Sequence, residues 1–178
     1  MPIPPMPVLL PFASPLHVVL VAPQIPPNAG NVMRTCAVTG ATLHLVGPLG
    51  FSLDDKKLRR AGLDYWPHVQ PGVYRDWPDF EARPPAAPDG EGRPLHERLH
   101  LFTARAERSL FDVAFSPGDV LVFGQEQLGL PPALLDAWPA RQVGLPMLPG
   151  QRSLNLAVAV GVGVYAALMQ LARRPSLP

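Results

Sequence analysis

The sequence contains one cysteine, Cys36, in 178 residues. A single cysteine cannot form an internal disulfide, and it cannot supply the paired thiols of a zinc or redox motif. We therefore expect Cys36 to be a small buried hydrophobic residue. The N-terminus also lacks a basic region followed by an apolar run, and its prolines would break a signal helix. These absences predict a cytoplasmic protein.

Charged residues are scarce, at 16%, whereas hydrophobic residues make up 47%, which is typical of a compact chain. The formal net charge of +1 says little about a polyanionic partner. No acidic residue follows Asp136, however, so the C-terminal third is basic. Basic residues gather in two groups, one of Lys56, Lys57, Arg59 and Arg60 and one of Arg141, Arg152, Arg173 and Arg174. Each group would suit RNA phosphates, although a solvated helix face explains it equally well.

Common nucleotide-binding and catalytic motifs are missing. The chain has no Walker sequence and no G-x-S-x-G elbow. Gly161-Val-Gly163-Val-Tyr-Ala166 matches G-x-G-x-x-A, but its glycines fall inside a predicted helix instead of in a strand-to-helix turn. The histidines show no metal-ligand spacing. We expect neither a dinucleotide site nor a metal site.

Proline is abundant, with 25 residues that cluster in two segments. Both clusters predict irregular or extended chain, because proline fixes φ and lacks a backbone N–H. We therefore divide the chain into a proline-rich extension (1–15), a single domain (16–174) and a short tail (175–178). Within the domain, residues 83–95 are interpreted as a Pro/Gly-rich loop insertion.

Short β-branched runs alternate with helical segments along the domain. The predicted strands are residues 16–22, 42–46, 98–103, 119–123 and 141–145. The predicted helices are residues 31–39, with Asn28 as a possible cap, 109–114, 131–138 and 155–174. This alternation predicts an α/β fold in which a mostly parallel sheet is flanked by helices.

The last predicted helix, residues 155–174, is apolar around most of its circumference. Its uninterrupted apolar stretch runs only from Leu156 to Met169, which is shorter than the ~20 residues of a membrane span. We therefore expect a buried or interfacial helix. Gly161 and Gly163 each cost about 1 kcal/mol relative to alanine in a helix. We expect close packing against another backbone, within the chain or across a dimer, to offset that cost.

Three segments combine turn residues with polar side chains. In IPPNAGNVMR, from Ile25 to Arg34, a Pro-Pro-Asn turn precedes a helix, so that free N–H groups and Arg34 could face an anion together. A capped helix explains Asn28 but not Arg34, which would need a partner if it were buried. FGQEQLGLP, at 123–131, follows a predicted strand, where ligands approach a parallel sheet, although a tight turn explains it equally well. SLNL, at 153–156, lies at the start of the last predicted helix. Capping of that helix would explain Ser153 or Asn155 alone, whereas a ligand site would explain both.

In this order, IPPNAGNVMR, FGQEQLGLP and SLNL resemble the motifs of the SPOUT-class RNA 2'-O-methyltransferases. The resemblance is closest to the bacterial subfamily that acts on the wobble cytidine or uridine of tRNA. Residues 50–66, GFSLDDKKLRRAGLDYW, are also similar to a segment of that subfamily. The resemblance implies a SPOUT fold with a C-terminal deep trefoil knot, a homodimer and no membrane association. It further implies methyl transfer from S-adenosylmethionine to a tRNA ribose 2'-hydroxyl, with S-adenosylhomocysteine as product.

The resemblance also assigns roles to individual residues. It places Arg34, Asn28 and Asn155 in the catalytic set, Phe102, Gly124, Leu145 and Ser153 at the cofactor, and Arg152, Tyr165 and Glu126 at the RNA, with no metal. Because a guanidinium stays protonated, we expect Arg34 to hold a phosphate and stabilise the developing alkoxide instead of accepting a proton.

The chain departs from the subfamily pattern at four positions. Ala157 and Val158 replace two polar residues of the usual SLNLSN, while Gln125 and Leu128 stand where relatives often carry proline and arginine. These changes leave two alternatives open. One is the same chemistry on another tRNA position or on rRNA, and the other is a non-catalytic RNA-binding dimer that retains the fold.

Overall fold

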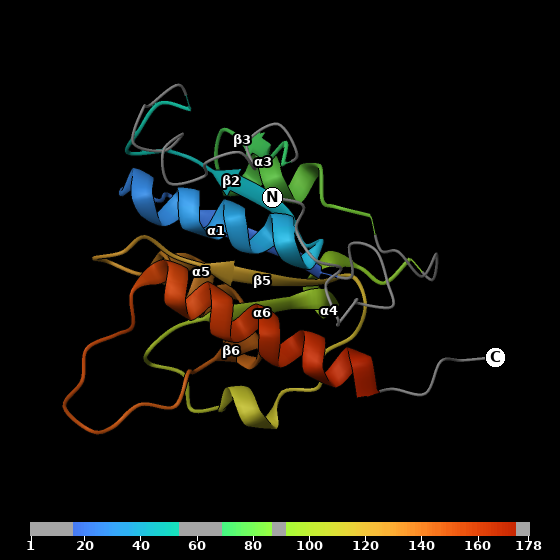
Figure 1. The fold of residues 1–178 in the computed structure, drawn as a ribbon, viewed down its shortest axis with the longest axis vertical. Coiled ribbons are helices and arrows are strands. Elements are labelled where there is room, and N and C mark those ends of the chain that lie inside the picture. The colour runs from blue at the N-terminus through green and yellow to red at the C-terminus, as the bar shows by residue number, and fades with distance from the viewer. Residues whose placement is uncertain (1–15, 54–68, 87–91, 174–178) are drawn as a thin grey trace, which may run out of the picture.

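The structure is a computed structural model that describes residues 16–53, 69–86 and 92–173. The predicted N-terminal extension, the basic group at 56–60 and most of the 50–66 segment lie outside these residues. The described part is built on one six-stranded parallel sheet (Figure 1). The predicted α/β class is therefore confirmed.

The sheet has the strand order β3-β2-β1-β5-β4-β6, and every neighbouring pair is parallel. Its strands are β1 (Leu16–Val21), β2 (Thr42–Val46), β3 (Gly72–Tyr74), β4 (Leu99–Phe102), β5 (Asp119–Phe123) and β6 (Gln142–Val143). The central strands β1 and β5 are buried along their whole length, as β-branched runs of this kind predict. All six carboxyl ends therefore meet at one edge, where parallel sheets usually bind ligands.

Helices cover both faces of the sheet. α1 (Pro26–Thr39) and α6 (Leu156–Arg173) lie side by side on one face (Figure 1). The other face is covered by α3 (Trp77–Ala82) and α5 (Pro132–Ala137), which bury Phe80 and Leu134 against it. A short helix, α4 (Leu95–Arg98), leads directly into β4. Two 3-10 turns, Leu110–Asp112 and Pro139–Arg141, complete the described elements.

Several predicted boundaries are wrong. α1 begins at Pro26 instead of residue 31, so Asn28 lies inside the helix and Ile25 occupies the N-cap position. Proline at the first helical positions lacks an N–H that the helix would leave unpaired, which is why Pro-Pro starts this helix instead of preceding it. The helix predicted at 109–114 is a single 3-10 turn capped by the Ser109 side chain. β3 and α3 were not predicted.

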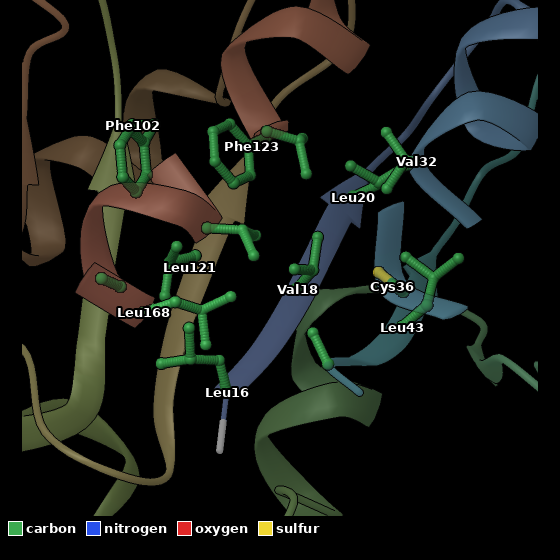
Figure 2. Packing of buried hydrophobic residues seen from close by; sticks show 14 of the residues in the cluster. Leu16, Val18, Leu20, Val32, Cys36, Leu43, Phe102, Leu121, Phe123 and Leu168 are labelled. Carbon is green, nitrogen blue, oxygen red and sulfur yellow. The ribbon is translucent and has the colours of Figure 1, made fainter. Parts of the chain in front are cut away.

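The core between the sheet and the α1–α6 layer is apolar. Figure 2 shows Leu16, Val18 and Leu20 of β1 in this cluster, with Cys36 of α1 near Leu43 of β2. Cys36 is 1% exposed, and burial raises the pKa of its thiol to about 12. The prediction of a small buried hydrophobic residue is confirmed.

One face of α6 is buried in the core, and the other is exposed. By length and composition it could cross a membrane, but here one of its faces is buried, including Val160, Val164 and Leu168. A Cβ on Gly163 would lie 3.1 Å from the Phe102 ring and 3.3 Å from the Phe123 ring. The predicted close packing at Gly163 therefore exists, but against two aromatic rings instead of a backbone. Nothing in the described chain lies within 4 Å of a Cβ built on Gly161.

The opposite face of the sheet contains a buried chain of polar rings. His17 Nδ1 lies 3.1 Å from His44 Nε2, and His44 Nδ1 lies 3.2 Å from the Tyr74 hydroxyl. The pKa of each imidazole is lowered to about 4, mainly by burial, with a smaller contribution from Arg98 at His17 and from His17 at His44. Both rings are therefore neutral in the folded protein at neutral pH.

We expect acid to destabilise the protein through this histidine pair. Because the folded pKa lies below the unfolded value of 6.5, the unfolded chain binds more protons as the pH falls from about 6.5 toward 4. One such histidine loses on the order of 2 kcal/mol of stability between pH 7 and pH 5. Urea unfolding at several pH values in this window measures the loss.

Two variants separate the pair from other titrating groups. His44→Gln removes one titrating ring and should flatten the dependence of the unfolding free energy on pH. His96→Gln, at a side chain that is 53% exposed, should leave it unchanged. If His44→Gln shows the same pH dependence as the wild type, the assignment to the buried pair is incorrect.

Candidate functional site

The loop after β5 closes tightly on itself. The N–H of Gln125 donates to the Gly129 carbonyl at 3.1 Å, and the N–H of Gly129 donates to the Gln125 carbonyl at 2.9 Å. Gly129 has a φ of 72°, which glycine adopts without strain. A Cβ on Gly124 would overlap the Gly129 carbonyl group and the Leu130 nitrogen. The FGQEQLGLP segment is thus a tight turn with glycine required at its base.

This loop forms one wall of a cavity of about 700 Å³ at the carboxyl edge of the sheet. The cavity is lined by all four residues expected at the cofactor, Phe102, Gly124, Leu145 and Ser153, together with Glu126 and Arg152. The Phe102 and Phe123 rings stack with their centroids 4.4 Å apart and give the cavity an apolar floor. Three loops far apart in the sequence therefore enclose one space suited to a ligand with an apolar, planar part.

The polar residues of the three motifs are joined by hydrogen bonds. The Glu126 carboxylate accepts from the Asn28 side chain at 3.0 Å. Asn28 Oδ1 in turn accepts from Asn155 Nδ2 at 2.9 Å. Asn155 Oδ1 accepts from the N–H groups of Ala157 and Val158, at 2.9 and 3.3 Å, and so caps α6. The chain from Glu126 through Asn28 to Asn155 links the β5 loop to the starts of α1 and α6.

The anion that the sequence predicted at the start of α1 is supplied by the chain itself. Glu126 also accepts from the backbone N–H groups of Gln24, at 2.9 Å, and Ile25, at 3.1 Å. A carboxylate at a helix N-terminus is stabilised by these donors and by the helix dipole. Glu126 therefore occupies two N–H groups beside the start of α1, and the role of Arg34 toward an anion stays a prediction.

The remaining predicted residues lie outside the cavity lining. Arg34 is exposed on α1, so the burial cost considered from the sequence does not arise. Tyr165 is 58% exposed on α6. Asn28 and Asn155 do not line the cavity, and Asn28 joins them to it through its hydrogen bond to Glu126, which does line it. Gln125 and Leu128, two of the departures, do line the cavity, whereas Ala157 and Val158 do not.

The segment after β4 also lines the cavity, although none of the three sequence motifs includes it. Thr103 and Arg105 line the cavity, and the Thr103 N–H donates to the Val143 carbonyl at 3.0 Å. The signal was available, because this segment follows a predicted strand at the same carboxyl edge. Among the described residues, no cluster of three histidine, cysteine, aspartate or glutamate side chains could hold a metal ion.

The chain is similar in sequence to known RNA methyltransferases. The profile of the SpoU rRNA Methylase family matches residues 15–165. A tRNA (cytidine(34)-2'-O)-methyltransferase from Burkholderia pseudomallei (strain 1106a) is 54% identical over 155 residues, covering 86% of this chain and 94% of its own.

Two solved structures are also similar over most of this chain. One described as structural insights into the 2-OH methylation of C/U34 on tRNA is 48% identical, covers 89% of this chain and 97% of its own, and has a TM-score of 0.79. An AdoMet-bound rRNA methyltransferase from Sinorhizobium meliloti, at 23% identity and a TM-score of 0.74, covers 92% of this chain and 59% of its own. At that identity the second likeness concerns the fold alone.

We expect Gly124→Ala to destabilise the protein by about 3 kcal/mol, because the added methyl group forces the Gly129 carbonyl out of its tight turn. Denaturant unfolding measures the change. Gln127→Ala is the control in the same loop, since it shortens an exposed side chain and adds no atom to the turn. It should change the stability by less than about 0.5 kcal/mol. Equal stability of Gly124→Ala and the wild type would contradict this account of the turn.

Proposed function

This chain belongs to the SpoU rRNA methylase family. From its likeness to relatives described as acting on position 34 of tRNA, we propose that it methylates the ribose 2'-hydroxyl of the wobble nucleotide, cytidine or uridine, of a tRNA. The methyl donor is S-adenosylmethionine, and the products are the 2'-O-methyl ribose, S-adenosylhomocysteine and a proton. The observation that carries the proposal is that FGQEQLGLP and SLNL line one cavity, and that Asn28 of IPPNAGNVMR is hydrogen-bonded to both segments.

The cavity fits the cofactor. Gly124 lines the cavity at the end of β5, and the stacked Phe102 and Phe123 rings offer an apolar surface to a planar adenine. We assign cofactor binding to Phe102, Gly124, Leu145 and Ser153, which line the same space. When bound, the cofactor supplies a methyl group activated by a positively charged sulfur.

Positioning of the ribose carries much of the catalysis that the protein itself must supply. We assign two roles to Arg34. It binds the phosphate beside the target ribose, and it stabilises the negative charge that develops on the 2'-oxygen of that ribose. Its guanidinium stays protonated and therefore does not accept the hydroxyl proton. Asn28 and Asn155 act as positioning residues, because their hydrogen bonds fix α1, which carries Arg34, against the loop that lines the cavity.

The changes at Ala157 and Val158 do not remove cavity residues. Neither lines the cavity, and Val158 is 52% exposed on α6. The replacement of two polar residues by Ala157 and Val158 suggested a non-catalytic RNA-binding protein. It changes α6 outside the cavity lining and leaves the residues that line the cavity unchanged. This supports the enzyme over the inert alternative.

The test of the proposed function is methyl transfer from labelled S-adenosylmethionine to total tRNA, followed by mapping of the labelled nucleotide. We expect the label on the 2'-oxygen of the wobble nucleotide. Label at another tRNA position, or only on rRNA, would replace the wobble assignment. Absence of transfer with correctly folded protein would overturn the enzymatic proposal.

We expect Arg34→Ala to lower kcat by about 100-fold, the usual cost of removing one donor to a developing oxyanion. Single-turnover methyl transfer measures this change, with calorimetric binding of S-adenosylmethionine as the control. Because Arg34 is exposed and lies outside the cavity lining, the variant should fold and should bind the cofactor as the wild type does. Wild-type turnover by this variant would refute the role.

We further propose that the protein is a homodimer that acts in the cytoplasm without a membrane. The exposed face of α6 carries an apolar stripe, Val158 (52% exposed), Val162 (43%), Tyr165 (58%) and Met169 (51%). Their spacing of three and four residues places them on one side of the helix. Gly161 adjoins this stripe with open space above it. A second copy covering the stripe would remove this apolar surface from water, and close approach of helices would use Gly161.

Val162→Lys should shift the protein toward monomer, because it buries an unpaired charge if the stripe is an interface. Sedimentation velocity at micromolar concentration reports the state. Val73→Lys is the matched control, since Val73 is similarly exposed, at 46%, but lies on the edge strand β3. It should leave the mass unchanged. A wild-type protein that is already monomeric at this concentration would contradict the dimer.

A further inference from the structure

Most arginines in the described ranges are held by partners in the chain. Arg75 and Arg83 pair with aspartates, and Arg98, Arg108 and Arg141 donate to backbone carbonyls. Within the part of the chain that the structure describes, the side chains of Arg105, Arg152 and Arg173 have no hydrogen-bond or ion-pair partner. Unpaired guanidinium groups are the ones available to an external anion.

Two of these three, Arg105 and Arg152, line the same cavity. Arg105 lies in the turn after β4, where its N–H donates to the Thr103 hydroxyl at 3.3 Å. Arg152 lies in the loop before α6. Both are exposed, so the cavity carries guanidinium groups from two separate loops on its solvent side.

The cavity has little negative charge to balance them. Glu126 is the one carboxylate among the described lining residues, and its oxygens accept three hydrogen bonds from Gln24, Ile25 and Asn28. That carboxylate is therefore turned toward the start of α1, leaving the guanidinium groups without a counterion. The mouth of the cavity thus attracts anions.

Apolar side chains complete the same mouth. Leu128 is 80% exposed and Leu154 is 42% exposed, and both line the cavity together with Met147. Exposed apolar groups beside unpaired cations match a nucleotide in a single strand, whose base has an apolar face and whose phosphates carry the charge.

We propose that Arg105 binds a phosphate of the substrate RNA at the mouth of this cavity, which Arg152 also lines. The inference rests on the proposed function and adds a binding residue to it. An anion here has two chemical sources, an RNA phosphate and the carboxylate of the cofactor. The structure favours the phosphate, because Arg105 is exposed and a backbone phosphate can reach it without entering the cavity.

The experiment compares Arg105→Gln with Arg173→Gln. Arg173 is the matched control, since it is also exposed and unpaired among the described residues but lies in the last turn of α6, outside the cavity lining. Binding of tRNA is measured by filter retention over a range of salt concentrations, and binding of S-adenosylmethionine by calorimetry. Methyl transfer by the wild type is recorded in parallel.

We expect Arg105→Gln to weaken tRNA binding about tenfold and to reduce the slope of log K against log salt by about 1. Its affinity for S-adenosylmethionine should stay within about twofold of wild type. Arg173→Gln should change neither binding constant by more than about twofold.

Three outcomes overturn the proposal. Loss of cofactor affinity in Arg105→Gln with unchanged tRNA binding would assign the guanidinium to the cofactor carboxylate. Equal weakening of tRNA binding by Arg173→Gln would show a general effect of charge. Unchanged binding of both ligands would leave Arg105 without a role. Failure of the proposed function is distinguished from these, because it appears in the wild type as absent methyl transfer.

Discussion

The carboxylate of Glu126 is the contact on which the arrangement of the site depends. It accepts from two backbone N–H groups ahead of α1 and from Asn28, whose own oxygen accepts from Asn155 at the start of α6. One loop at the end of β5 therefore fixes two helices that are separated by most of the chain. The amide groups of Asn28 and Asn155 donate in partly buried hydrogen bonds, where a donor left without an acceptor would cost about 1–3 kcal/mol. A glutamate and two asparagines at these positions thus serve the geometry of the site before any contact with a substrate.

α6 separates two surfaces that the proposed activity uses. Leu156 and Ala159 line the cavity, and Gly163 lies against the Phe102 and Phe123 rings that form its floor. The opposite side of the same helix carries the exposed apolar stripe that we propose as the interface between copies. Because interiors are closely packed, a displacement of α6 by a partner would be felt at the ring pair. The proposed interface and the cavity therefore share one helix, and that sharing would account for apolar residues around most of its circumference.

Much of the fold could be predicted from local sequence. Residues 42–46 and 119–123 are strands as predicted, because buried parallel strands are short continuous apolar runs. β3 was missed because three residues at a sheet edge, one of them Gly72, carry no periodic signal. The start of α1 was misplaced for another reason, because Pro26 and Pro27 were interpreted as a turn before the helix although they occupy its first positions. What the local pattern could not show is the carboxylate that binds there, since Glu126 is 102 residues from Gln24.

The candidate site also contains residues that the sequence predicted and residues that it did not. Motif likeness selected four residues that line one cavity, because each follows a strand or opens a helix where the backbone sets its place. The place of Arg105 after a predicted strand could be read from the sequence, but its lack of a partner within the chain could not. Arg98 and Arg141 are bonded to backbone carbonyls of their own chain, whereas Arg105 and Arg152 are not. A net charge of +1 therefore coexists with a locally cationic mouth. What attracts a polyanion is the distribution of unpaired cations, and only the folded chain determines it.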